Sequence, residues 1–366
     1  VDVMSVNPLS VPKGVHYSCE LCGKSAFIQC QDCRVTYYCC KEHQEVDFAS
    51  IHQKICKDLV QLRTSSLVLG SEEERIKRQH LVLQTQKELI ELTRTESLKA
   101  LIRDDYDLAI PAALQALRIS LDVHGQGKIE LVPAYLLLGE ASIGKGMFSQ
   151  AEEYLSMAKW VVLKHDDCSN EIKSQLHRNM GKLYTAQGKY EEALRQLSND
   201  VYYSSLVYGP RHVRTSPGYF YMGQAFAACR NVDRALVFYG KLQSIWEEWL
   251  SDIMSRQDDV PTEELLDEAE CVEAADMLEK ITRFREGVMG PAAVATAEAL
   301  YVQGLFHYYV EDLQKALEML EQAERIFKVE LGDDHKTSEH CRQWIARTEE
   351  EIRQKIAEGE GEMHTG

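Results

Sequence analysis

Residues 138–155 read LGEASIGKGMFSQAEEYL, and two related stretches follow at intervals of 42 residues. They read MGKLYTAQGKYEEALRQL at 180–197 and MGQAFAACRNVDRALVFY at 222–239. Each has a glycine at its second position and an alanine twelve residues later: Gly139 and Ala151, Gly181 and Ala193, Gly223 and Ala235. Self-similarity at a fixed period of this length is typical of repeat architectures, in which each unit stacks on its neighbours.

These small residues have a direct meaning for packing. A glycine in a first helix and an alanine in a second helix allow two antiparallel helices to approach closely. One such hairpin would leave an apolar face exposed, so the hairpins must stack on one another. Strand signals are sparse throughout the sequence. We therefore predict a mainly α fold, an α-solenoid of helical hairpins with a period of about 42 residues.

The array extends beyond these three copies. A fourth copy is displaced by 81 residues from the third and consists of Gly304, Ala316 and Leu320. The additional residues predict a helical insertion at about 250–290, either a helix pair or a degenerate repeat. A degenerate first repeat near 90–131 is in register with the others, so we expect the array to span 90–330.

The segments on either side of the array are assigned as follows. Ser71 and Glu74 form a capping-box sequence, and we expect a connecting helix over 57–89. An amphipathic helix and a tail over 331–366 would cap the end of the array. Residues 1–18 are expected to form an N-terminal tail.

Composition restricts the kinds of partner. The 366 residues contain 41 Lys and Arg against 58 Asp and Glu, a net charge of -17, which disfavours a general attraction to nucleic acid or anionic lipid. No apolar run approaches the 18 residues that a membrane span needs, and the sequence does not open with a secretory signal. We therefore expect an intracellular, cytoplasmic protein with protein partners and with no nucleic acid or membrane partner.

The cysteines point to metal. Eleven are present, and seven of them lie between Cys19 and Cys56. Two C-x2-C pairs and two Cys/His pairs with i,i+4 spacing supply eight ligands: Cys19, Cys22, Cys30, Cys33, Cys39, His43, His52 and Cys56. Eight ligands suffice for two closed tetrahedral zinc sites, although spacing alone leaves their pairing open. Cys40 is interpreted as a bystander. Because no coordination position stays open for water, we expect two structural zinc ions and no metal catalysis.

This segment, 19–56, resembles the MYND-type zinc finger. The C-x2-C pairs, the Tyr38-Cys39 pair and the closing His52 and Cys56 stand where that family's pattern places them. The resemblance implies two interleaved sites, with Cys19, Cys22, Cys39 and His43 on one zinc and Cys30, Cys33, His52 and Cys56 on the other. His43 departs from the family, which usually has cysteine at this position, but imidazole is an acceptable zinc ligand.

The same resemblance implies a peptide-binding groove. Several MYND fingers bind proline-containing peptides through a glutamine and a tryptophan, and Gln44 and Phe48 occupy the matching positions here. Phenylalanine keeps an apolar face for proline but lacks the indole donor. The alternative is that Phe48 packs the finger onto the next helix.

The repeats resemble tetratricopeptide repeats, in the lengthened form found in kinesin light chains. The first helix of each pair would then line an inner face, and the positions that we place there are Glu140, Arg178, Lys182 and Gln224. A clamp for a terminal carboxylate would need cations in successive repeats. The mixed charges favour a broad groove for a helix or an extended segment instead.

The order of a MYND finger and long-period repeats resembles a family of ciliary scaffold proteins. The resemblance implies a non-catalytic protein–protein interaction scaffold of the axoneme in motile cilia and sperm flagella. Its implied partners are inner dynein-arm subunits, which it would help to assemble or dock, and another tetratricopeptide-repeat protein.

Two alternatives remain. The first is a nuclear corepressor-type adaptor that binds proline-containing peptides through the finger alone. The second is a SET-type lysine methyltransferase, since such enzymes also combine a MYND finger with helical repeats. Only 18 residues precede Cys19, and the helical pattern begins soon after Cys56, so we expect no catalytic domain and no enzyme activity.

Overall fold

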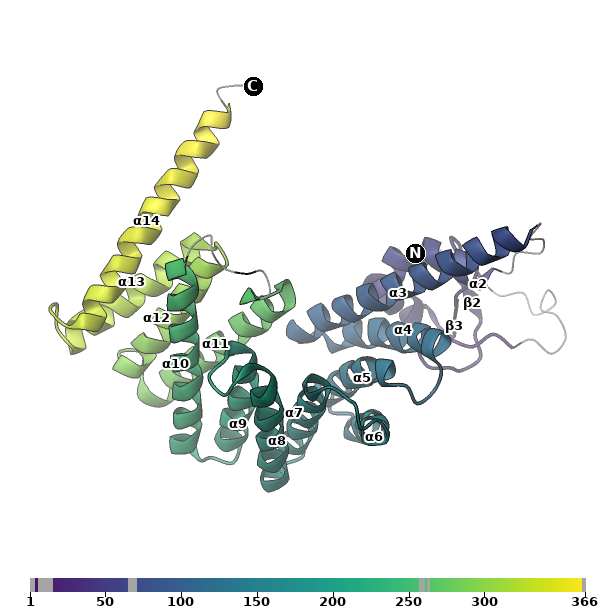
Figure 1. Cartoon of the computed structure of the whole chain (residues 1–366), viewed down its shortest axis with the longest axis horizontal. Helices are drawn as coiled ribbons and strands as arrows, with labels where there is room; N and C mark the ends of the chain where they lie inside the picture. The colour runs from purple at the N-terminus through teal and green to yellow at the C-terminus, as the bar shows by residue number, and fades with distance from the viewer. Residues whose placement is uncertain (1–3, 6–15, 65–70, 257–260, 262–263, 364–366) are drawn as a thin grey trace. The chain divides into compact units, whose positions relative to one another are not determined.

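The computed structural model describes residues 4–5, 16–64, 71–256, 261 and 264–363 (Figure 1). The chain divides into two compact units, Val1–Gln196 and Leu197–Gly366. Both units are built mainly from helices, which confirms the predicted fold class. None of the helices among the described residues is long and apolar enough to cross a membrane.

The first unit begins with a small antiparallel sheet and a continuous helical segment. The strands are β1 (Met4–Ser5), β2 (Ile28–Gln29) and β3 (Tyr37–Tyr38), in the order β1-β2-β3. The helical segment consists of α1 (Lys41–Asp47), the π-helical turn η2 (Phe48–His52) and α2 (Gln53–Arg63). The range 1–18 is thus not only a tail, because Met4 and Ser5 form backbone pairs with the open edge of β2.

Helical hairpins form the rest of the first unit. α3 (Glu72–Ile102) pairs with α4 (Tyr106–His124), and α5 (Val132–Gly144) pairs with α6 (Phe148–Lys164). The 3-10 turn η3 (Ile129–Leu131) leads into α5. α7 (Asn170–Ala186) follows, and the first residues of α8 (Tyr190–Tyr208) still belong to this unit.

The second unit continues from the C-terminal part of α8. It contains η4 (Val213–Thr215), α9 (Ser216–Ala228), α10 (Val232–Arg256), α11 (Glu268–Met289), α12 (Val294–Tyr309), α13 (Leu313–Glu330) and α14 (Lys336–Met363). α9 pairs with α10 and α12 pairs with α13, as the repeat predicts. Each hairpin joins helices of consecutive sequence, so the contacts within it are local.

The small residues of the repeat lie where paired helices touch. A Cβ atom added to Gly139 would lie 2.8 Å from Leu155 Cδ2, and one added to Gly304 would lie 2.8 Å from Leu320 Cγ. Both contacts are closer than carbon atoms tolerate, so a side chain at either glycine would push the helices apart. Ala151 and Ala316 are fully buried in the partner helices. The packing role inferred from the repeat is therefore confirmed.

The predicted insertion between the third and fourth copies is not a regular pair of helices. Among the described residues between α10 and α12, one further helix is present, α11. α10 itself is 25 residues long, and its C-terminal half packs on α12 through Trp246 against Phe306 and Trp249 against Tyr309. The extension of α10 therefore supplies the packing surface that a separate first helix would provide in a regular hairpin.

The flanking helices differ in extent from the predicted segments. The range 57–89 contains the end of α2 and the start of α3, with residues 65–70 outside the described residues. The Ser71 hydroxyl accepts a hydrogen bond from the Glu74 amide, and the Glu74 carboxylate accepts one from the Ser71 amide, which confirms the capping box. In the predicted segment 331–366, α14 packs against α13.

Candidate metal centre

Two groups of four ligand side chains gather in the N-terminal segment. In the group that we name the outer tetrad, the ligand atoms of Cys19, Cys22, Cys39 and His43 all lie within 4.8 Å of one another. In the inner tetrad the same holds for Cys30, Cys33, His52 and Cys56. The structure thus brings together the two sets that the resemblance implies, in the same interleaved pairing.

Distances between ligand atoms test whether zinc fits. Zn–S bonds of about 2.3 Å and Zn–N bonds of about 2.0–2.1 Å at tetrahedral angles require about 3.5–3.8 Å between ligand atoms. His43 Nδ1 lies 3.4 Å from Cys19 Sγ and 3.3 Å from Cys39 Sγ. His52 Nε2 lies 3.3 Å from Cys30 Sγ and 3.7 Å from Cys33 Sγ. Both tetrads therefore fit structural zinc ions, one each.

Local structure presents these ligands. Cys30 follows β2 directly and Cys39 follows β3 directly, so the strand pairing holds ligands of both sites. His52 and Cys56 lie one helical turn apart on the continuous η2–α2 segment, as the i,i+4 spacing predicts. The other i,i+4 pair does not lie on one helix, because Cys39 precedes α1 and only His43 lies within it.

The two tetrads differ in burial. All four residues of the inner tetrad are buried, and His52 is 2% exposed. In the outer tetrad Cys19 is buried, Cys39 and His43 are half-buried, and Cys22 is exposed. Water and small solutes can therefore reach the ligands of the outer site but not those of the inner site.

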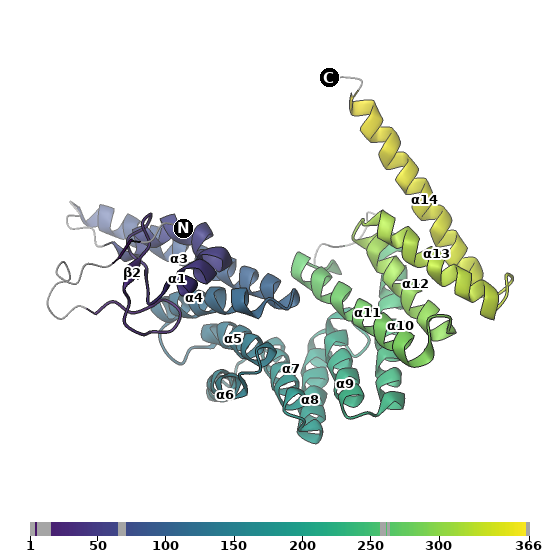
Figure 2. The ribbon, with the colours of Figure 1, turned by 180° about the vertical axis from the view of Figure 1, so that it is seen from behind.

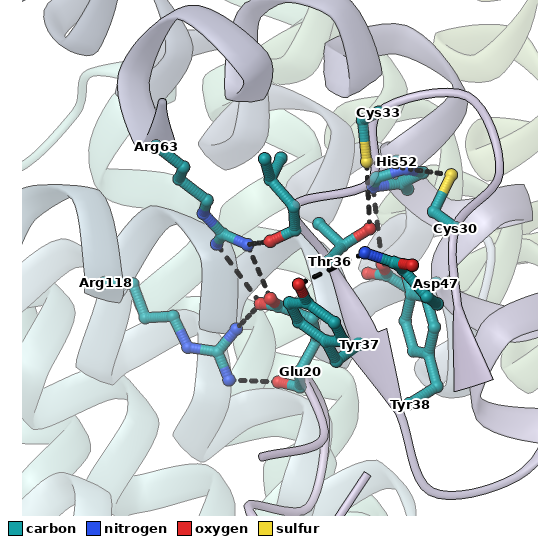
Figure 3. Close-up of polar contacts among 12 residues, drawn as sticks. Glu20, Cys30, Cys33, Thr36, Tyr37, Tyr38, Asp47, His52, Arg63 and Arg118 are labelled. Carbon is teal, nitrogen blue, oxygen red and sulfur yellow. Dashed lines mark hydrogen bonds and ion pairs between the residues drawn. The ribbon is translucent and has the colours of Figure 1, made fainter. Parts of the chain in front are cut away.

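A buried carboxylate lies behind His52. The Tyr38 hydroxyl donates a hydrogen bond of 2.6 Å to Asp47 Oδ2, and the same oxygen lies 3.8 Å from His52 Nδ1 (Figure 3). Burial raises the pKa of Asp47, while the hydrogen bond from Tyr38 and the nearby His52 oppose this shift. Burial and the charge of Asp47 together raise the pKa of Tyr38, so its hydroxyl stays protonated and donating.

A second acidic residue links the finger to the helices. The Glu20 carboxylate accepts hydrogen bonds of 2.5 and 3.2 Å from the two terminal guanidinium nitrogens of Arg63 on α2 (Figure 3). Arg118 on α4 donates to the Glu20 carboxylate and to its backbone carbonyl. Burial alone would lower the pKa of Arg63, but the hydrogen bond and the charge of Glu20 raise it. We call these three residues the Glu20 clamp.

Apolar contacts join the same elements. Ile51, Ile55 and Leu59 of the η2–α2 segment share one buried cluster with residues of the first hairpin: Leu89, Ile90, Ala112 and Ile119. The Ser50 hydroxyl donates a hydrogen bond of 2.5 Å to the carbonyl of Leu108 on α4. In both ribbon views the finger lies against α3 and α4 (Figure 2). The finger is therefore packed onto the first hairpin rather than held by a linker.

Of the two residues at the predicted peptide groove, one is buried and the other half-buried. Gln44 is only 2% exposed, on a helix, α1, that contacts α4. Its Oε1 atom has no hydrogen-bond partner among the described residues. Phe48 is half-buried in η2, which packs against α3 and α4, and its ring lies 6.3 Å from the ring of His52. A peptide could not contact the Gln44 side chain while it is buried in this way.

The residues predicted for the inner face are partly paired with one another. Lys182 Nζ lies 2.7 Å from Glu140 Oε1, a contact that links α7 to α5 across one repeat period. Arg178 on α7 and Gln224 on α9 are half-buried. The Lys182–Glu140 pair neutralises a cation that a carboxylate clamp would need.

The sequence analysis did not identify the residues that join the finger to the first hairpin or that support the zinc ligands. Glu20 lies between two zinc ligands, and Arg118 is 98 positions away from it. Asp47 and Tyr38 have no spacing that marks them as partners. No local pattern identifies such contacts, because only the folded chain brings them together.

Comparison with known proteins supports the assignment of this segment. Residues 19–56 match the family model of the MYND finger. Egl nine homolog 1 from Homo sapiens is 48% identical over 40 residues, which are 11% of this chain and 9% of that protein. The chain thus spans less than a tenth of the length of this curated relative.

Solved structures are similar to about two thirds of this chain. Two crystal structures of a putative kinesin light chain from Podosopora anserina with nearly identical TPR-like repeats are 14% identical, with TM-scores of 0.34 and 0.35, over 67% of this chain and 96% of theirs. BtubC (BKLC) from P. vanneervenii is 15% identical, with a TM-score of 0.30, over 66% of this chain and 92% of its own. The repeat architecture rests on the hairpins of this chain itself.

Proposed function

Because residues 19–56 are a MYND finger packed on the first of a series of helical hairpins, we propose that this chain is a non-catalytic scaffold for protein assembly. MYND fingers and stacked helical hairpins are both interaction modules. The finger and hairpin α3–α4 would act as one rigid part, and the helical surfaces would bind the partners.

The observation that carries this proposal is the packing of the finger. Ile51, Ile55 and Leu59 form one apolar core with α3 and α4, and the Glu20 clamp adds charged hydrogen bonds at its edge. Such packing supports a structural role for the zinc ions, since metal binding stabilises the end of the helical array.

The charge of the two units indicates the chemistry of a partner. The first unit has 24 Lys and Arg against 26 Asp and Glu, and the second has 17 against 32, so their net charges are -2 and -15. An acidic surface attracts basic partners and accelerates their association. We propose that the second unit binds a basic protein segment.

Charge reversal tests this idea. Glu318 and Glu321 are exposed on α13, and the double change Glu318→Lys and Glu321→Lys should weaken binding of the basic partner and reduce its dependence on salt. The double change Glu152→Lys and Glu153→Lys on α6 of the first unit reverses the same number of exposed charges and should leave binding unchanged. Equal effects of both variants would contradict a role for the second unit.

The finer proposal places the scaffold in the axoneme, with inner dynein-arm subunits and another tetratricopeptide-repeat protein as partners. It is supported by the order of finger and repeats along the chain. Crosslinking mass spectrometry of the endogenous protein in its native complex tests it. Crosslinks to axonemal proteins are the expected result, and crosslinks confined to nuclear corepressors would overturn it.

A corepressor-type adaptor is the second candidate, and the burial of Gln44 disfavours it. A titration with proline-containing peptides distinguishes the two functions. If the finger is an adaptor, Gln44→Ala and Phe48→Ala should abolish binding of the peptide. If the helical units bind the partner protein, the same changes should leave binding of that partner unaffected. Methyl transfer from S-adenosylmethionine by the purified protein would contradict both.

A further inference from the structure

The outer tetrad has a property that a purely structural zinc site does not need. Its Cys22 side chain is exposed, and Cys39 is half-buried. The three inner cysteines, Cys30, Cys33 and Cys56, are only 3%, 5% and 8% exposed. Oxidation of cysteine follows thiolate character and access, and zinc holds its cysteine ligands as thiolates. The two sites therefore differ in access to oxidants, not in ligand chemistry.

The sulfur atoms of the accessible site are already close. Cys22 Sγ lies 3.5 Å from Cys39 Sγ, whereas a disulfide bond needs about 2.0 Å. Cys40 Sγ, which belongs to neither tetrad, lies 3.6 Å from Cys39 Sγ. At the inner site Cys33 Sγ also contacts the Thr36 hydroxyl at 3.1 Å, a polar contact that holds this sulfur in place.

We propose that the outer tetrad is an oxidation site, at which a peroxide joins Cys22 and Cys39 in a disulfide and releases the outer zinc ion alone. This modification goes beyond the scaffold function, which requires only that both ions be bound. The inner ion stays bound because its ligands are buried.

The chemistry balances with peroxide as the oxidant. One thiolate attacks the O–O bond of hydrogen peroxide, which forms a sulfenic acid and releases hydroxide. The second thiolate attacks the sulfenic sulfur, forms the S–S bond and displaces a second hydroxide. Two protons from the buffered solution convert the two hydroxides to two water molecules. The sulfurs lose two electrons and the peroxide gains them, and Cys19 and His43 alone then hold the zinc too weakly.

Loss of the outer ion has a defined structural consequence. Glu20 follows the ligand Cys19 and lies within the first C-x2-C pair, so the outer zinc positions the residue that Arg63 and Arg118 grip. The apolar core of Ile51, Ile55 and Leu59 does not involve this ion. Oxidation would therefore loosen the Glu20 clamp and leave α1 and α2 packed on the first hairpin.

In the test, the 366-residue chain is loaded with two zinc ions and treated with hydrogen peroxide. Zinc release is followed with a coloured chelator, and disulfides are mapped by mass spectrometry of peptides. We expect release of one of the two zinc ions together with a Cys22–Cys39 disulfide, and rebinding after treatment with a thiol reductant and zinc. Release of both ions together, or a first disulfide among the inner cysteines, would overturn the proposal. So would retention of both ions while free cysteine in the same solution is oxidised.

Two variants separate the roles of the cysteines. Cys40→Ser keeps all eight ligands, and we expect it to release zinc as the unaltered protein does. A requirement for Cys40 would overturn the Cys22–Cys39 assignment. Cys22→His supplies a nitrogen ligand without sulfur, so after a check that it binds two zinc ions we expect it to retain both in peroxide. Release from that variant at the normal rate would also count against the proposal.

Hydrogen exchange reports the consequence for the clamp. After oxidation, amide exchange should increase in the segment 19–26 and stay unchanged in α2 and α3. Arg118→Ala, which weakens the clamp directly, should increase exchange in the same segment without loss of zinc. Faster exchange throughout α2 after oxidation would show that the inner site had opened too.

Discussion

Asp47 Oδ2 lies 3.8 Å from His52 Nδ1, on the side of the ring opposite the nitrogen that faces Cys30 and Cys33. This separation is longer than a hydrogen bond, so the carboxylate acts on the ring through its charge, which favours the tautomer that carries its proton on Nδ1 and binds the ion through the other nitrogen. The hydroxyl of Tyr38 holds the carboxylate in turn. These two residues thus form a second layer of contacts around the inner zinc site.

We expect Asp47→Ala to lower the affinity for the inner zinc by about 10- to 100-fold, the usual cost of removing such a partner. Competition with a chelator of known affinity measures this, one ion at a time. Tyr38→Phe keeps the ring and removes only the hydroxyl, so a smaller loss is expected. Glu45→Ala, on the exposed face of α1, is the control. Unchanged zinc affinity in Asp47→Ala would show that this carboxylate does not support the inner zinc site.

The Glu20 clamp predicts a loss of stability without loss of metal. Glu20→Ala leaves two arginines without their carboxylate, and hydrogen bonds to charged groups contribute about 1.5–3 kcal/mol. We expect the free energy of unfolding of the first unit to fall by about 2 kcal/mol, less than the sum of two buried pairs because both arginines are partly exposed. Urea denaturation with the zinc content measured in parallel checks this. A zinc content below two per chain would show that Glu20 acts on the metal instead.

Removal of zinc should affect the two units unequally. A segment of 38 residues with little apolar material depends on its metal, and structural zinc contributes roughly 10–16 kcal/mol of apparent binding energy. With a strong chelator we expect α1 and α2 to unfold and α3–α4 to lose protection from hydrogen exchange, since they share one core. The helices of the second unit should keep theirs. Protection retained throughout α3 and α4 would mean that the hairpin is stable alone.

Two glycines of the second unit together test whether the repeat glycine allows close approach of paired helices. A Cβ at Gly304 would lie 2.8 Å from Leu320 Cγ, so Gly304→Ala should destabilise the unit by about 1–3 kcal/mol through overpacking. Gly287 on α11 has no atom within 4 Å of such a Cβ, and Gly287→Ala should stabilise by up to about 1 kcal/mol because alanine favours helix. Thermal unfolding compares them. A shift of the same sign in both would contradict close approach at Gly304.

Alkaline pH should destabilise the second unit in part through one thiol. Burial raises the pKa of Cys341 to about 12, whereas an exposed thiol ionises near a pKa of about 8.5. Between these values the unfolded chain releases a proton that the folded chain keeps, so the free energy of unfolding falls as pH rises, by at most about 1.4 kcal/mol per pH unit. Below that range this thiol has no effect.

Cys341→Ala isolates this contribution. The variant should lose less stability than the unaltered protein between about pH 8 and about pH 10, where the free thiol begins to ionise. Urea denaturation at several pH values measures both slopes. Parallel slopes would show that Cys341 does not contribute, whatever the absolute stabilities, because the buried tyrosines affect both proteins equally.

The eight zinc ligands and the helical hairpins could be predicted from the sequence because both depend on local spacing. C-x2-C pairs and i,i+4 pairs place ligand atoms near one ion, and Gly139 and Ala151 mark helices that must approach closely. Even the irregular interval between Gly223 and Gly304 predicted extra helix. The interval did not show that an extension of α10 would take the place of one of the two inserted helices. This outcome depends on how Trp246 and Trp249 of α10 pack against α12.

Sequence by itself thus determined the metal ligands and the repeated hairpins, which depend on residues a few positions apart. Tertiary structure alone decided which tetrad is exposed, that Gln44 is buried, and that Glu20 meets Arg118 across 98 positions. The physical reason is that burial and charge pairing are properties of neighbours in space. The free energy that brings them together comes from the apolar surface shared by the finger and α3–α4, which no local pattern of residues records.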